Sequence, residues 1–142
     1  MNFIPDANQL TSIFSQALAP AFLLGAVAGF VSLLMRRLHG VVERLVSLTK
    51  IAGSGTPQAD VIHEIPYLKR RAVLLNTAAY LALSAGIATT LLLLVSFAAA
   101  VFKLHHIYGG ALLFALANGL LMVSLFKFAQ EVRVELSEIR QY

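Results

Sequence analysis

The chain is 142 residues long, 58% hydrophobic and only 13% charged, with a mean hydropathy of +0.78. A soluble domain of this length cannot bury so much apolar surface, so lipid must solvate much of the chain. Cysteine is absent, which excludes disulfides, thiolate metal sites and cysteine nucleophiles. The net charge of +4 does not indicate nucleic acid, because the basic residues flank apolar stretches and so face anionic lipid headgroups.

The first amphipathic stretch spans residues 8–16. Apolar residues recur there with helical spacing, opposite polar residues, beginning with Leu10, Ile13 and Phe14. This pattern predicts a short helix that lies in the membrane interface. A plain helical extension of the first span explains the same pattern, and both alternatives stay open.

The first membrane span is predicted over residues 17–35. Pro20 stands near its start, where a missing N–H does little harm. Gly25, Gly29 and Ser32 form a stripe of small residues that would allow another helix to approach closely. We expect this stripe to serve ordinary packing within the subunit, with a dimerisation site as the alternative.

Residues 36–71 are predicted to form a hairpin outside the membrane. An apolar seam continues the helix past Arg36 and Arg37 with spacings of three and four: Leu34, Leu38, Val41, Leu45 and Leu48. A water-exposed helix with such a seam needs a partner. The seam ends at a Gly-rich and Pro-containing loop over residues 51–57, and the return helix is predicted to begin near Ile65, or to kink there, because of Pro66.

The second span covers residues 72–102, thirty-one residues without a charged side chain. As a helix it would be roughly 46 Å long, more than a hydrocarbon layer of about 30 Å, so it must tilt or extend past the membrane. One face carries a stripe of polar residues in the half near the hairpin: Asn76, Thr77, Tyr80 and Ser84. The opposite face carries residues with small side chains: Ala78, Ala82, Ala85 and Thr89. We expect the small face to pack on the first span and the polar stripe to make interhelical hydrogen bonds; the alternative is a wetted vestibule.

A turn at residues 103–108 leads to the third span, predicted over residues 109–126. Asn118 lies near its middle, where an amide should find a partner. Residues 127–142 are predicted to be a helical tail with a further apolar seam: Leu125, Phe128, Val132, Leu136 and Ile139. The other faces of this helix are expected to carry Glu131, Arg133, Glu135 and Glu138.

The distribution of basic residues predicts the orientation. Seven Lys and Arg residues lie between the first two spans and three in the tail, whereas the turn between the second and third spans has only Lys103. By the positive-inside rule the hairpin and the C-terminus are cytoplasmic and the N-terminus lies outside. The predicted fold is therefore an all-α integral membrane protein with three spans whose cytoplasmic ends extend beyond the bilayer.

Acidic and basic residues gather at the cytoplasmic ends of all three predicted spans. We hypothesise that they form an ion-pair group that joins the helical extensions: Arg37, Glu43, Arg44, Glu64, Arg70, Arg71 and Glu131. The alternative is that each is a solvated headgroup anchor, since surface ion pairs contribute little to stability.

Three elements of the chain resemble a known family. They are Ala19-Pro20-Ala21-Phe22-Leu23-Leu24, the run from Glu64 to Arg71 that leads into Leu75-Asn76-Thr77-Ala78, and Phe128-Ala129-Gln130-Glu131-Val132. Over residues 10–134 the chain is similar to the bacterial membrane proteins of the domain of unknown function 2721 family. Glu43-Arg44 departs mildly from the Asp-Arg pair common there. The resemblance implies a three-span protein of the bacterial inner membrane and supplies no activity.

The residues offer no catalytic, cofactor or metal site, and we expect no enzyme. The predicted spans lack Asp, Glu, Lys, Arg and His, which argues against ion-coupled transport. The four histidines do not have metal-ligand spacing, and no nucleophile has a matching base. Two functions remain: an oligomeric scaffold or accessory subunit that docks onto copies of itself or onto a larger membrane complex, or a homo-oligomeric channel lined by the polar stripe.

Overall fold

The computed structural model describes residues 6–55, 59–102 and 107–140. They form three helices: α1 (Ala7–Ala52), α2 (Ala59–Phe102) and α3 (Ile107–Ile139). All three are long and apolar enough to cross a membrane, which confirms the predicted all-α chain with three such helices. Most of the turn predicted at 103–108, and residues 141 and 142 of the tail, lie outside the described residues.

Helix α1 is continuous from its cap to its end. The Asp6 side chain accepts a hydrogen bond from the Ala7 backbone N–H at 2.9 Å, which satisfies one of the free donors at the start. The helix runs without a break through residues 8–16, so this stretch is the plain extension of the first span and not a separate interfacial helix. It ends at Gly53, whose N–H donates to the Thr49 carbonyl, and Gly55 follows at a φ of 96° that glycine adopts readily.

Helix α2 begins earlier than the sequence predicted. Its first residue is Ala59, and Pro66 lies inside the helix. Proline removes the N–H that would donate to the carbonyl one turn back, but this part of the helix extends past the apolar span, where water can satisfy that carbonyl. The start near Ile65 was therefore a wrong prediction.

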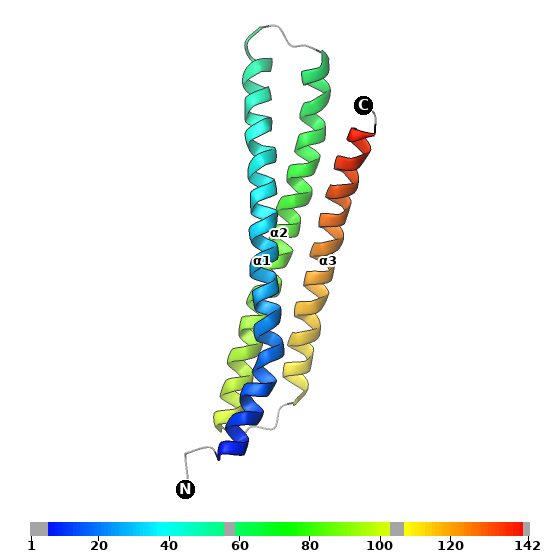
Figure 1. The fold of residues 1–142 in the computed structure, drawn as a ribbon. Helices are drawn as coiled ribbons and strands as arrows, with labels where there is room; N and C mark the ends of the chain where they lie inside the picture. The colour runs from blue at the N-terminus through cyan, green and yellow to red at the C-terminus, as the bar shows by residue number, and fades with distance from the viewer. Residues whose placement is uncertain (1–5, 56–58, 103–106, 141–142) are drawn as a thin grey trace.

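Helix α2 contacts both other helices, and in Figure 1 it lies between α1 and α3 in the upper half and passes behind α1 in the lower half. α1 and α3 run parallel to each other and antiparallel to α2, so the C-terminal ends of α1 and α3 and the start of α2 lie at the same end of the molecule (Figure 1). α2 packs extensively on both of its neighbours, whereas α1 and α3 scarcely contact each other. The chain is thus an open layer of helices and not a closed bundle.

Buried residues on α1 recur at intervals of seven: Pro20, Val27, Leu34, Val41 and Leu48. This repeat is typical of helices that wind around each other as a coiled coil. It incorporates the apolar seam predicted from Leu34 to Leu48, and its partner is α2, which contributes Leu68, Leu75 and Ala82 to the same core.

The small residues of α2 serve both neighbours. Ala78, Ala82, Ala85 and Thr89 are fully buried. Ala78 contacts α3, because its carbonyl accepts a hydrogen bond from Ser124 at 2.6 Å. The prediction that the small face packs on the first span is therefore only partly right, since this face also meets α3. On the other side, a Cβ at Gly86 would lie 3.3 Å from Val27, so glycine lets α1 and α2 approach closely.

We predict that Leu48→Ala destabilises the α1–α2 hairpin by about 3 kcal/mol, because Leu48 is buried and its truncation leaves a cavity. The matched control is Ile62→Ala, which should change stability by less than about 1 kcal/mol, since Ile62 is exposed. Amide hydrogen exchange over residues 44–52, in nanodiscs, is the measurement. Equal loss of protection in both variants would contradict this packing.

Candidate functional site

Glu131 is a fully buried carboxylate, with 0% of its surface exposed. It lies on α3 seven residues after Ser124 and fourteen after Ala117, and both of these are also fully buried. The seven-residue repeat therefore places Glu131 on the face of α3 that packs on α2. Glu131 lies on another face than the predicted apolar seam, as expected, but the buried face of α3 is the one that carries Glu131. Leu136 and Ile139 of the predicted seam are exposed.

Two arginines from different helices neutralise Glu131. Arg71 of α2 donates from Nε and approaches with Nη2, each 2.8 Å from Glu131 Oε1. Arg37 of α1 donates from Nη2 to Glu131 Oε2 at 2.9 Å. Both arginines also contact Glu135, one turn further along α3. We refer to Arg37, Arg71, Glu131 and Glu135 as the four-residue cluster.

Aromatic rings surround the cluster on its membrane and hairpin sides. The Phe30 and Phe128 rings pack edge to face with centroids 5.6 Å apart, which bridges α1 and α3. The Arg37 guanidinium lies 5.3 Å from the Phe128 centroid, and that of Arg71 lies 5.7 Å from the Tyr67 centroid. Glu131 is shielded from water, which strengthens its ion pairs, whereas Arg37 and Glu135 stay partly exposed.

Burial and charge act on the titratable groups here. Burial alone would lower the pKa of Arg37, but hydrogen bonds and charge from Glu135 and Glu131 hold it above its usual value. Burial raises the pKa of Tyr67, so its phenol stays neutral. Arginine does not release its proton, so both guanidiniums stay charged beside the two carboxylates. The cluster therefore joins one charged side chain from α1 and one from α2 to two on α3.

The other members of the predicted ion-pair group lie elsewhere. Arg44 and Glu64 form a separate, more exposed pair between α1 and α2, with Nε and Oε1 3.2 Å apart. Glu43 contacts His39 on its own helix, and Arg70 is exposed. Only Arg37, Arg71 and Glu131 of the predicted seven meet in one cluster.

Glu135 was missed as a member of the cluster. Its place could have been inferred from Glu131, because residues four apart lie on the same side of a helix. The sequence analysis did not identify which face of α3 packs on α2. The seven-residue spacing of Ala117, Ser124 and Glu131 marks that face.

The predicted polar stripe of α2 faces outward. Asn76, Tyr80 and Ser84 are exposed, and Thr77 is partly exposed. Thr77 and Ser84 donate to carbonyls one turn back on α2, and exposed Asn118 does the same on α3. Within the described chain these three side chains do not make the predicted interhelical hydrogen bonds.

The small stripe of α1 also faces outward. Gly25, Gly29 and Ser32 are exposed, and a Cβ at either glycine would meet no atom within 4 Å. The expected packing of this stripe inside the subunit is therefore not observed. An open apolar groove of about 690 Å³ lies beside it, between α1 and α2, and is lined by residues that include Ala28, Gly86 and Thr90.

These features define the class of the chain: a protein of three helices, each long and apolar enough to cross a membrane. Residues 17–141 match a protein family of unknown function, DUF2721, and the chain belongs to that family. No curated protein and no solved structure is significantly similar to it.

We predict that Glu131→Gln lowers the free energy of unfolding by about 3 kcal/mol, because it leaves Arg37 and Arg71 without their shared buried counter-charge. Glu43→Gln is the control and should cost less than about 0.5 kcal/mol, since Glu43 forms only an exposed pair. Denaturation in mixed micelles measures both. Similar values for the two variants would show that the cluster does not stabilise the fold.

Proposed function

We propose that the protein is a multi-pass scaffold or accessory subunit of the bacterial inner membrane. In this proposal the hairpin and the C-terminus are cytoplasmic and the N-terminus lies outside. α1, with 46 residues, is about 69 Å long, so it extends well past a hydrocarbon layer of about 30 Å. The four-residue cluster lies where the apolar spans end and braces the extensions against one another.

Exposed apolar side chains on these extensions carry the proposal. Val42 and Val46 on α1 are 40% and 48% exposed, and Leu136 and Ile139 on α3 are 59% and 64% exposed. In this proposal the lipid ends near Arg37 and Glu131, and these four apolar residues lie beyond that edge, in water. Apolar surface held on braced helices in water favours binding of another protein.

Basic residues at the proposed membrane boundary support an interaction with anionic lipid. Arg36, Lys69 and Arg70 are exposed, and Lys127 is partly exposed. The nearby acidic residues Glu131 and Glu135 already neutralise Arg37 and Arg71. The boundary therefore keeps a positive charge that attracts anionic headgroups, at about 1 kcal/mol per basic residue.

The outward polar stripe of α2 favours a second candidate, a homo-oligomeric channel. Asn76, Tyr80 and Ser84 take no part in packing within the described chain. Three helices cannot enclose a water-filled path alone, but several copies could place this stripe around an axis.

We predict that a single cysteine at Ser54 reacts with a membrane-impermeant maleimide only after the cell membrane is opened. Ser54 lies in the α1–α2 turn, and the chain has no cysteine of its own. Labelling of intact cells at the same rate would place the hairpin outside and overturn the proposed orientation.

We predict that the protein in liposomes conducts no ions above the level of empty liposomes. The protein mass in each native-lipid nanodisc, with lipid and belt subtracted, should also be at least twice the 15.3 kDa of one chain. Conductance under voltage or tension that Asn76→Leu abolishes would favour the channel instead. Asn118→Leu is the control, because Asn118 lies on α3 and outside the stripe.

A further inference from the structure

A second seam runs along the outside of α1. Its residues alternate in steps of four and three, which places them on one narrow strip of the helix. Every member is exposed in the protomer; they are Ala21, Gly25, Ala28, Ser32, Met35, His39, Val42, Val46 and Thr49. We call this strip the outer seam. It is about 42 Å long, from residue 21 to residue 49.

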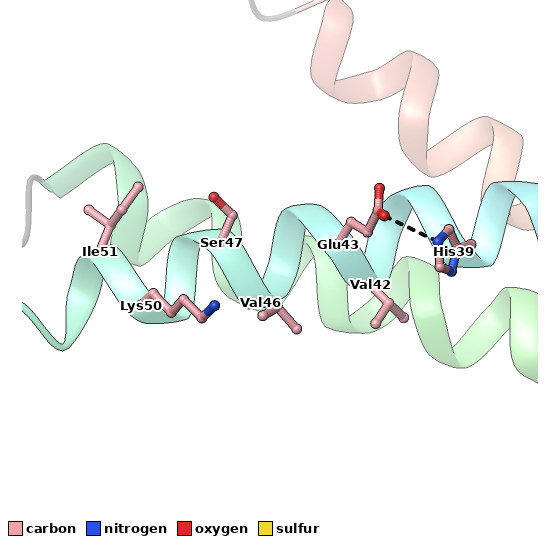
Figure 2. Close-up of a pocket in the computed structure, with 7 residues that line it drawn as sticks. All are labelled: His39, Val42, Glu43, Val46, Ser47, Lys50 and Ile51. Atoms are coloured by element: carbon pink, nitrogen blue, oxygen red, sulfur yellow. Dashed lines mark ion pairs between the residues drawn. The ribbon is translucent and has the colours of Figure 1, made fainter.

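The outer seam changes character along its length. Its first half lies in the predicted span and is small, with nothing within 4 Å of a Cβ at Gly25. Its second half carries Val42 and Val46, which project side by side from α1 (Figure 2). They line a shallow hollow of about 460 Å³, together with His39, Glu43 and Lys50. Small residues suit close helix approach in lipid, and valines suit coiled-coil packing in water.

Lipid alone cannot cover this seam. Val42 and Val46 lie five and nine residues past Arg37, or roughly 8 Å and 14 Å along the helix. The headgroup layer beyond the hydrocarbon is only about 5–8 Å deep on each side. A cover for the whole seam must therefore be a helix that leaves the membrane at the same place and continues into water.

Charge distinguishes this seam from the outer face of α3. The outer seam has no Lys, Arg, Asp or Glu from residue 21 to residue 49. On α3, exposed Leu136 stands between exposed Arg133 and Arg140. Burial of an unpaired arginine against an apolar strip is costly. Two outer seams can meet without this penalty.

We propose that the outer seam of α1 packs against the outer seam of a second copy of this chain. Copies that insert by the same rule point α1 in the same direction, so the pair is parallel and two-fold symmetric. The partner helix then has the required length and leaves the membrane at the same residue. Gly25 meets its counterpart in the lipid, and Val42 and Val46 interlock beyond it.

This pairing rests on the proposed scaffold role and names its first partner. Phe30 and Arg37, which reach α3, lie on the opposite side of α1 from the seam, about 180° away at 100° per residue. A dimer formed this way leaves the outer face of α3 free. The assembled pair could then present two copies of that face to further proteins.

Single-cysteine variants of the cysteine-free chain test the pairing in native membranes. After mild oxidation, Val42→Cys and Val46→Cys should give a product of twice the 15.3 kDa of one chain. The yield should exceed that of Ser47→Cys by at least about fivefold, because only the seam brings like residues within disulfide reach. Ser47 is also exposed and borders the same hollow, but it projects to the opposite side of α1 from Val42 and Val46 (Figure 2), so it lies off the seam. Leu136→Cys is the control on α3.

Gly25→Ile in the Val46→Cys background tests the membrane half of the seam. The open space at Gly25 accepts isoleucine within the protomer, so the fold should survive while the yield of dimer falls about tenfold. An unchanged yield would overturn the continuous seam. Equal yields at Val42, Val46 and Ser47, or the highest yield at Leu136, would overturn the pairing. Crosslinks only to a different protein would also overturn it, and would leave the scaffold proposal standing.

Discussion

The fold depends on a buried carboxylate that two arginines neutralise. Removing the Glu131 charge from water costs several kcal/mol, which only close ion pairs and hydrogen bonds can offset. Arg71 supplies them from α2 and Arg37 from α1, so the cluster is complete only when all three helices are in place. Because α1 and α3 scarcely pack on each other, these ion pairs and the Phe30–Phe128 contact are what join them. The cluster thus specifies one arrangement of an otherwise open layer.

The position of the cluster divides the helices into two physical regimes. On the side of the long apolar stretches, small residues such as Ala78, Ala82 and Gly86 let the helices approach closely, which suits packing in lipid, where the hydrophobic effect does not drive association. On the hairpin side, leucines such as Leu48 and Leu68 bury apolar surface from water. One seven-residue repeat serves both regimes along α1.

The faces that the protomer leaves uncovered motivate the proposals. The outer seam of α1 and the exposed leucine and isoleucine of α3 are apolar surfaces on rigid extensions, which suits assembly better than catalysis. The polar stripe of α2 is exposed, and Thr77 and Ser84 donate to carbonyls of their own helix. Copies meet on α1 in the scaffold proposal and on this stripe in the channel proposal, so the two differ in where copies bind.

The amino-acid sequence by itself determined the three apolar helices, the family and the buried seam from Leu34 to Leu48, because hydropathy and helical period are properties of one segment. It also brought Arg37, Arg71 and Glu131 into one hypothesis through their similar depth. Only the tertiary structure decided that Glu135 joins them while Glu43, Arg44, Glu64 and Arg70 do not, and that the Gly25 stripe faces outward. The face of α3 that meets α2 depends on contacts between segments, which no single segment's pattern encodes.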